Sequence, residues 1–262
     1  MPPSRPLVVA HRGSSAQYAE HTLAAYVRAL DEGADALECD VRLTADGQLV
    51  CVHDRKVNRT SDGRGIVSEL ELADLAELDF ASWHHSAPEA PDLDENRRVL
   101  TLERLLQLVR DHDRPVRMLI ETKHPNRWAG LVEQTLVKLL DQYGMSKPLD
   151  PDNAVATVMS FNPVALRRMR LLRPQVPRVL LLNKVLPFRR DGSLPQGVRI
   201  AGPSVRIVRS HPEYVSKLRA RGNQVYCWTV DDPDDIGAVL RTGVDAVITN
   251  RPTDVLRALG RA

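Results

Sequence analysis

Three short polar groups near the start of the chain hold the side-chain types that phosphate ester chemistry needs. Residues 11–13 (His-Arg-Gly) follow a short apolar run, and residues 38–40 (Glu-Cys-Asp) and 53–54 (His-Asp) come soon after. Carboxylates bind hard divalent ions, imidazoles carry protons near neutral pH, and a guanidinium group can hold two phosphate oxygens at once. The three groups therefore predict metal-assisted cleavage of a phosphate ester at the ends of β-strands.

Glu38 and Asp40 are the first candidate metal ligands. Successive side chains of a strand point to opposite faces, so these two point to one side and Cys39 points to the other. Carboxylates held this close repel each other, and a divalent cation relieves the repulsion. Glu121 ends the third expected strand in the same way and offers a third oxygen. Oxygen ligands alone favour Mg²⁺ or Ca²⁺ over zinc.

A plainer interpretation of the Glu-x-Asp pair is that it ends a strand with solvated charges. Short motifs often occur by chance, and for the pair taken alone this interpretation is preferred. Glu121 and its neighbour Lys123, placed equivalently on the following strand, favour the metal site instead.

His11 and His53 are the candidate catalytic residues. His11 follows the first expected strand, and His53 follows a short extended run that a turn at 45–47 folds back against the second strand. Both imidazoles are therefore expected near the carboxylates, where one can activate an oxygen and the other can protonate a leaving group. We expect His11 to be the base and His53 the acid. The role of His21 is undecided at this level.

Two cations are expected beside the metal ion. Arg12 can grip two phosphate oxygens in a fork, and Lys123 adds a point charge. Three carboxylates, a divalent ion and these two cations leave one net positive charge when the histidines are neutral. That charge matches a phosphodiester monoanion better than a phosphomonoester dianion.

Trp228 is a third candidate substrate-binding residue, because it lies in the last part of an expected strand at 224–229. An aromatic ring at the mouth of the site can pack against a substrate or hold a cationic head group over its face. Packing in the core explains the same residue equally well.

Short apolar runs alternate with helical patterns along the chain. Eight runs are expected to form strands: 7–10, 36–41, 116–121, 155–160, 178–182, 205–208, 224–229 and 246–249. Helices are expected at 22–30, 102–111, 128–143, 163–172, 213–221, 234–242 and 253–259. This α/β repeat, with right-handed crossovers, closes into a (β/α)₈ TIM barrel whose site lies at the carboxyl ends of the strands. A doubly wound open sheet is the alternative, although no Gly-x-Gly-x-x-Gly follows the first strand.

The stretch 55–98 interrupts this repeat after the second strand. It contains a helical segment at 69–78 followed by an aromatic loop. We expect it to cap one end of the barrel, either as a lid or as a structural element, since long loops in compact domains are more often functional. The whole chain, 1–262, is expected to be a single barrel domain with this insertion inside it.

The composition argues against several other classes of protein. With 36 basic and 34 acidic residues the formal net charge is only +2, which argues against a nucleic-acid binder. No apolar run is long enough for a membrane span. The three cysteines lie in apolar runs and are expected to be free thiols, which fits a reducing compartment. We therefore expect a cytoplasmic monomer or homodimer that acts on a small-molecule phosphodiester.

The chain resembles the glycerophosphodiester phosphodiesterases, which are (β/α)₈-barrel enzymes that release glycerol 3-phosphate from deacylated phospholipids. The resemblance runs from near Val8 to near Leu256. Besides the three groups above, it rests on Glu20, Thr22, 58–60 (Asn-Arg-Thr), 100–103 (Leu-Thr-Leu-Glu), Glu121 with Lys123, 160–161 (Ser-Phe), 228–230 (Trp-Thr-Val), 243–245 (Gly-Val-Asp) and 250–252 (Asn-Arg-Pro). Motifs this numerous, in this order, are specific when taken together.

The resemblance implies the same site that the residues predict. The family's acid and base histidines fall on His11 and His53, its metal carboxylates on the three acids named above, and its phosphate-contacting cations on Arg12 and Lys123. It also implies a two-step route through a cyclic phosphate, which the sequence does not separate from direct attack by water. The first loop departs from the family pattern, because residues 19–22 read Ala-Glu-His-Thr where the family usually has Pro-Glu-Asn-Thr.

The expected function is metal-dependent hydrolysis of glycerophosphodiesters, such as glycerophosphocholine or glycerophosphoethanolamine, to glycerol 3-phosphate and an alcohol. Two alternatives remain open. A lysophospholipase D-type phosphodiesterase would share this core and would need an apolar groove near the insertion for an acylated substrate. A non-catalytic barrel that binds phosphodiesters would lack a catalytic or metal residue, and none is missing.

Overall fold

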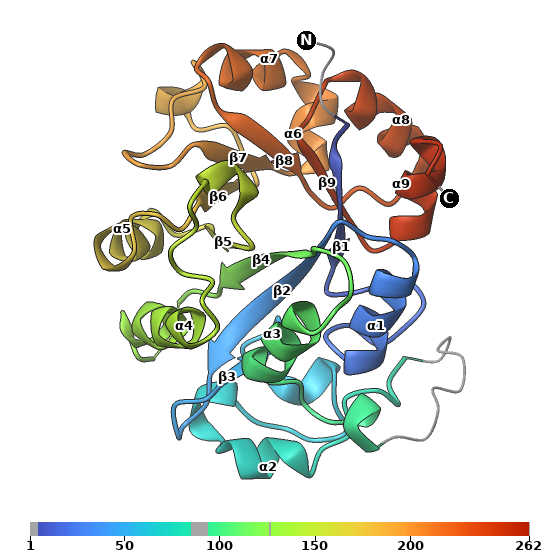
Figure 1. Cartoon of the computed structure of the whole chain (residues 1–262), viewed down its shortest axis with the longest axis vertical. Helices are drawn as coiled ribbons and strands as arrows, with labels where there is room; N and C mark the ends of the chain where they lie inside the picture. The colour runs from blue at the N-terminus through green and yellow to red at the C-terminus, as the bar shows by residue number, and fades with distance from the viewer. Residues whose placement is uncertain (1–4, 85–93, 126, 262) are drawn as a thin grey trace.

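A closed ring of eight parallel strands forms the centre of the computed structural model, which describes residues 5–84, 94–125 and 127–261 (Figure 1). The strands are β1 (Leu7–His11), β2 (Ala36–Leu43), β4 (Arg117–Thr122), β5 (Ala156–Ser160), β6 (Arg178–Leu182), β7 (Ile200–Pro203), β8 (Gln224–Cys227) and β9 (Ala246–Thr249). β1 pairs with both β9 and β2, so the ring has no open edge. The predicted (β/α)₈ barrel is confirmed, and the open sheet is excluded.

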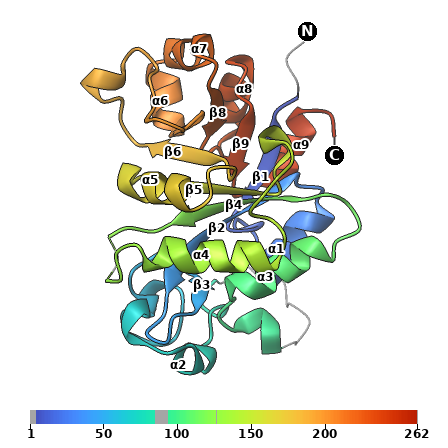
Figure 2. The same ribbon diagram turned by 60° about the vertical axis from the view of Figure 1, so that its left-hand side comes forward.

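Helices cover the outside of the ring. They are α1 (Leu23–Asp31), α3 (Leu102–Arg110), α4 (Leu131–Gln142), α5 (Pro163–Leu172), α6 (Val205–Ser210), α7 (Glu213–Ala220), α8 (Pro233–Arg241) and α9 (Pro252–Ala258). Several begin at a residue whose side chain accepts a hydrogen bond from a free backbone N–H, as Asn162 does for α5 and Asp232 does for α8. Neighbouring helices such as α4 and α5 lie side by side (Figure 2). In the described part of the chain, no helix combines the length and apolar character needed to cross a bilayer.

The predicted strand at 205–208 is wrong. These residues begin α6, and the strand of the ring is β7, which lies just before them. The β-branched run at 205–208 suits a strand by composition, whereas Gly202 and Pro203 suggest a turn. Gly202 packs closely against the neighbouring strand: a Cβ atom there would lie 2.7 Å from Cδ2 of Leu181, whose side chain would have to shift.

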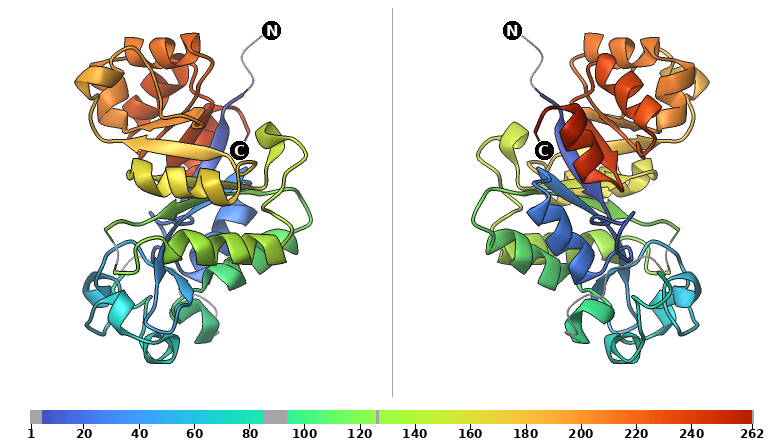
Figure 3. Two further views of the ribbon diagram at one scale, coloured as in Figure 1. Left: turned by 90° about the vertical axis from the view of Figure 1, so that its left-hand side faces the viewer. Right: turned by 90° about the vertical axis from the view of Figure 1, so that its right-hand side faces the viewer.

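β3 (Leu49–Cys51) follows β2 and pairs antiparallel with it outside the ring, and the predicted insertion comes after β3. The short elements that follow are η1 (Val57–Arg59), η2 (Val67–Glu69), α2 (Leu72–Ala76) and η3 (Asp94–Arg97). The helix predicted at 69–78 is therefore shorter and preceded by a 3₁₀ turn. Residues 85–93 of the predicted insertion lie outside the described residues. Figure 3 shows the described part at one end of the molecule, opposite α6–α8.

The buried apolar residues form four clusters. One cluster fills the inside of the barrel, with Leu119, Met159 and Ile248 among its members. Two larger clusters lie between the strands and the helices, and a fourth, which includes Val67 and Leu75, lies under the insertion. Burying each large apolar side chain contributes about 1.5–3 kcal/mol. The packed interior fixes the strand ends, and those ends position the polar residues described next.

Candidate active site

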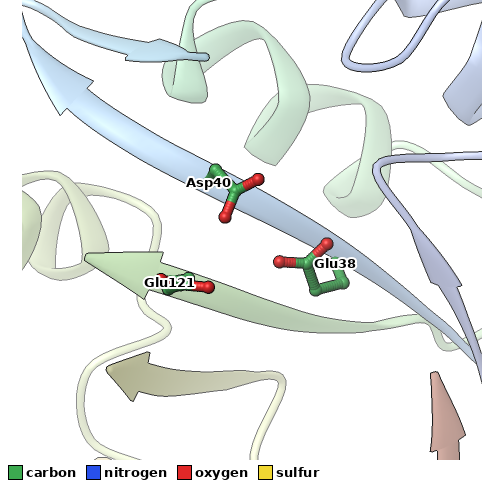
Figure 4. A group of neighbouring side chains, drawn as sticks. All are labelled: Glu38, Asp40 and Glu121. Atoms are coloured by element: carbon green, nitrogen blue, oxygen red, sulfur yellow. The ribbon is translucent and has the colours of Figure 1, made fainter. Parts of the chain in front are cut away.

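Glu38 and Asp40 on β2 and Glu121 on β4 point into one space at the carboxyl end of the barrel (Figure 4). Asp40 is paired with Glu121 across the two parallel strands, and His11 on β1 is paired with Glu38. One ligand oxygen from each acid lies within 4.8 Å of the others. Cys39 points the other way, into the layer between strands and helices. The alternation of side chains along β2 thus brings the three acids together.

The three acids are almost removed from water, since their residues are 1 %, 1 % and 7 % exposed. Burial, with repulsion from Asp40, raises the pKa of Glu38 well above its usual value and that of Glu121 to about 7. Burial also opposes ionisation of Asp40, but a hydrogen bond from His21 and the charges of Lys123 and Arg12 hold its pKa well below its usual value. A cluster of buried oxygens whose charges repel fits a hard divalent cation.

Arg12 and Lys123 contact these acids from two sides. The Arg12 Nε atom lies 3.0 Å from Oδ2 of Asp40, and its Nη1 lies 3.0 Å from Oε1 of Glu20. The Lys123 Nζ atom lies 2.8 Å from Oε1 of Glu121 and 3.3 Å from Oδ1 of Asp40. Both cations also line the cavity at the acids, so a phosphate held there would meet two positive charges.

His11 is held by a residue from the other end of the chain. Its Nδ1 lies 2.7 Å from Oδ1 of Asn250, whose Nδ2 donates to Oδ2 of Asp231 at 2.5 Å. Because a carboxylate only accepts, the Asn250 amide oxygen must face His11, and His11 Nδ1 must carry the proton. Nε2 of a neutral His11 therefore has a free lone pair, and it faces the acids 3.9 Å from Oε2 of Glu38. Burial, with the charge of Arg12, lowers the pKa of His11 to about 3.

His53 lies across the cavity from the apolar wall and is more exposed than His11. Its Nδ1 donates to Oδ1 of Asp54 at 2.6 Å, which leaves Nε2 available to a substrate. Arg59 holds Asp54 through an Nε–Oδ2 contact of 2.7 Å and also pairs with Glu20. Burial lowers the pKa of His53, although its hydrogen bond with Asp54 acts in the opposite direction.

His21, undecided from the sequence, lies under the acids. It is 5 % exposed, its Nε2 is 3.0 Å from Oδ2 of Asp40, and its Nδ1 is 2.8 Å from the Tyr26 hydroxyl. Tyr26 in turn donates to the Glu38 carbonyl oxygen. His21 also has a φ of 61°, in the left-handed region that histidine and asparagine enter more readily than most residues. At the position where the family usually has asparagine, His21 thus makes a hydrogen bond to Asp40.

A cavity of about 120 Å³ opens above the acids. His11, Arg12, Glu38, His53, Glu121 and Lys123 line its polar side, and Met159, Phe161, Leu181, Trp228 and Ile248 line its apolar side. Asp40 lies behind them. Trp228 donates from Nε1 to the Gly202 carbonyl oxygen at 2.6 Å and meets the edge of Phe161 at a ring distance of 5.3 Å. The structure thus places Trp228 opposite the charged residues, with its ring held in a fixed orientation.

A sharp turn carries the chain from His11 into the next loop. Arg12 and Gly13 have φ values of 59° and 84°. A Cβ atom on residue 13 would lie 2.6 Å from the carbonyl carbon of Ala25 in α1. Only glycine allows this approach, so Gly13 holds the turn that places Arg12 beside the acids.

Replacing Gly13 with alanine is expected to lower the free energy of unfolding by about 2–5 kcal/mol, because a left-handed backbone and a steric overlap both add strain. Gly47 is a matched control, since it has the same φ of 84° and no atom within 4 Å of its missing Cβ. Gly47→Ala should cost only the backbone part, about 1–2 kcal/mol. Urea unfolding curves measure both, and equal losses would contradict the steric argument.

Three residues at the site were not assigned a role from the sequence. Asn250 and Glu20 belong to the motifs that carry the resemblance, and His21 stands at a departure from it. For Asn250 the sequence offers one signal of a role at the site: it follows the last strand directly, and the carboxyl ends of all barrel strands meet at the same face.

Comparisons with known proteins agree with this geometry. Residues 11–254 match the model of the glycerophosphoryl diester phosphodiesterase family. The chain is 46 % identical over 248 residues to a probable glycerophosphodiester phosphodiesterase 1 of Mycobacterium tuberculosis, covering 94 % of this chain and 90 % of that protein. It is 34 % identical over 256 residues to a glycerophosphodiester phosphodiesterase of Bacillus subtilis, covering 95 % and 85 %.

Solved structures have the same fold. A putative glycerophosphoryl diester phosphodiesterase from Silicibacter pomeroyi superposes with a TM-score of 0.83 at 26 % identity, covering 98 % of this chain and 94 % of that one. A phosphodiesterase from Oleispira antarctica in complex with the product sn-glycerol-3-phosphate superposes with a TM-score of 0.82 at 26 % identity, covering 97 % of each chain.

Proposed function

The chain belongs to the glycerophosphoryl diester phosphodiesterase family, and on this premise we propose that it cleaves glycerophosphodiesters to glycerol 3-phosphate and an alcohol with the aid of Mg²⁺ or Ca²⁺. The single observation that carries this proposal is the buried cluster of Glu38, Asp40 and Glu121 next to His11 and His53 in one cavity. The glycerol 3-phosphate bound to the Oleispira enzyme supports the same product here.

Glu38, Asp40 and Glu121 would hold the divalent ion, which would draw charge from a non-bridging phosphate oxygen. Arg12 and Lys123 would contact the remaining phosphate oxygens, and Trp228 would pack against the substrate on the apolar side. This arrangement fits a phosphate with two ester bonds, because one face of the cavity is charged and the other is apolar.

The two histidines divide the proton transfers. His11 accepts the proton of the attacking hydroxyl at Nε2, because Asn250 fixes the other nitrogen as the donor. His53 donates a proton from Nε2 to the leaving alcohol, because Asp54 stabilises its protonated form and its greater exposure lets it exchange protons with water. This assignment is compatible with attack by a glycerol hydroxyl and with attack by water.

The proposal is tested by offering the purified protein glycerophosphocholine, glycerophosphoethanolamine and glycerophosphoglycerol, each with Mg²⁺, Ca²⁺ or EDTA. We expect release of glycerol 3-phosphate with at least one of the ions and its loss in EDTA. Lysophosphatidylcholine, assayed in parallel, tests for an acylated substrate. Turnover that persists in EDTA, or a phosphorylated alcohol as the product, would refute the proposal.

A further inference from the structure

A second cavity, of about 240 Å³, is lined by residues from the end of β2, from the insertion and from the segment after β4. Three arginines line it, Arg42, Arg55 and Arg127, and so does Trp128. Building on the proposed function, we propose that this cavity receives the leaving alcohol of the diester and selects alcohols that carry a negative charge, such as a second phosphate or a carboxylate.

Arg42 connects this cavity to the acids. It lies on the same face of β2 as Glu38 and Asp40, two residues beyond Asp40, so its Cα lies about 7 Å further toward the mouth. Its Nε and Nη2 donate to the carbonyl oxygen of His53 at 3.1 and 2.7 Å. The Arg42 guanidinium group therefore lies between His53 and the second cavity.

The position of His53 gives the direction of the leaving group. The residue that protonates the leaving alcohol must lie beside that alcohol's oxygen. In this proposal the alcohol that leaves past His53 moves toward Arg42, which contacts the His53 carbonyl oxygen and also lines the second cavity. Arg55 lies just after His53 in the chain and lines the same cavity.

The charged side chains in the described wall of the cavity are arginines, and most of the other residues are apolar. Among the described residues that line it, none is acidic. The Arg127 guanidinium lies 4.9 Å from the centre of the Trp128 ring. Arginine forks match the geometry of both phosphate and carboxylate groups.

Other occupants suit the cavity less well. A cationic alcohol such as choline would be repelled by three guanidinium groups. A long acyl chain would cover these groups without giving them acceptors. Apolar side chains such as Ile66 and Val67 form part of the wall and can pack against the carbon atoms of the alcohol.

Three substrates that differ in the charge of the leaving alcohol test the inference: glycerophosphocholine, glycerophosphoglycerol and bis(glycerophospho)glycerol, in which the alcohol carries a second phosphodiester. After correction for its two equivalent ends, kcat/KM for the bis compound should exceed that for glycerophosphoglycerol by about tenfold, the scale of one charge-assisted hydrogen bond. Glycerophosphocholine should be the poorest of the three. The preference should shrink as salt is added.

Substitutions of the lining residues test whether the charge preference arises in this cavity. The double variant Arg55→Gln/Arg127→Gln should lower kcat/KM for the bis compound far more than for glycerophosphoglycerol. Arg241→Gln, at the far end of α8, removes one charge from the opposite face of the barrel and should leave the ratio unchanged. Thermal unfolding of each variant checks that the fold is retained.

The outcomes separate this inference from the proposed function. Turnover of all three substrates without a charge preference, or with glycerophosphocholine or lysophosphatidylcholine preferred, overturns the inference alone. A preference that survives in the double variant also overturns it. No turnover of any diester refutes the proposed function and the inference with it.

Discussion

His11→Ala is expected to lower kcat for glycerophosphodiester hydrolysis by about 10²–10⁴-fold, the usual contribution of a positioned acid or base. The physical reason is geometric. Asn250 and Asp231 fix the His11 ring so that its unprotonated Nε2 faces the acids, and the described residues offer no second imidazole at that point. Release of glycerol 3-phosphate at saturating substrate and ion measures the effect.

The same assay with an activated leaving group distinguishes the roles of the two histidines. His53→Ala should lose a comparable factor on glycerophosphoglycerol, but it should recover most of its rate on glycerol 3-(4-nitrophenyl phosphate), because nitrophenolate leaves without a proton. His11→Ala should not recover. His112→Ala, in the turn after α3, is the control and should keep the wild-type rate on both substrates. Recovery by His11→Ala in place of His53→Ala would reverse the assignment.

Much of the site could be predicted because its main groups follow from local rules. Side-chain alternation on one strand places Glu38 beside Asp40, and the parallel register of β2 and β4 places Glu121 opposite Asp40. The turn after β2 brings His53 back toward the same strand ends. Each of these relations involves one strand, a pair of adjacent strands or a turn, so each can be predicted from the sequence.

The contacts that hold the site depend on the closure of the whole ring. Asn250 reaches His11 only because β9 pairs with β1, and no local spacing relates residues so far apart in sequence. The residues of β7 do not predict a strand for a similar reason, since Gly202 and Pro203 suggest a turn and only their pairing with β6 shows that they lie in the sheet. The arginines of the second cavity also come from separate segments, so their juxtaposition is visible only in three dimensions.

Glu121→Gln is expected to weaken binding of Mg²⁺ or Ca²⁺ and to lower activity by at least about tenfold, since it removes one of the charged oxygens proposed to hold the ion. In the metal-free protein, by contrast, the same substitution should not lower the stability. Three buried carboxylates repel each other, so removing one charge should leave the metal-free variant as stable as the metal-free wild type, or more stable. An ion that binds only the folded wild type at 100 times its Kd adds about 2.7 kcal/mol of stability.

Titration calorimetry and thermal unfolding, each with and without the ion, measure these two effects independently of turnover. Glu103→Gln is the matched control, because Glu103 is an exposed acid on α3 outside the cluster and should leave ion binding unchanged. Equal stabilisation of wild type and Glu121→Gln by the ion would place the ion elsewhere. If the metal-free variant is markedly less stable, the contact between Glu121 and Lys123 outweighs the repulsion among the acids, and the cluster is held together by its cations rather than by an ion.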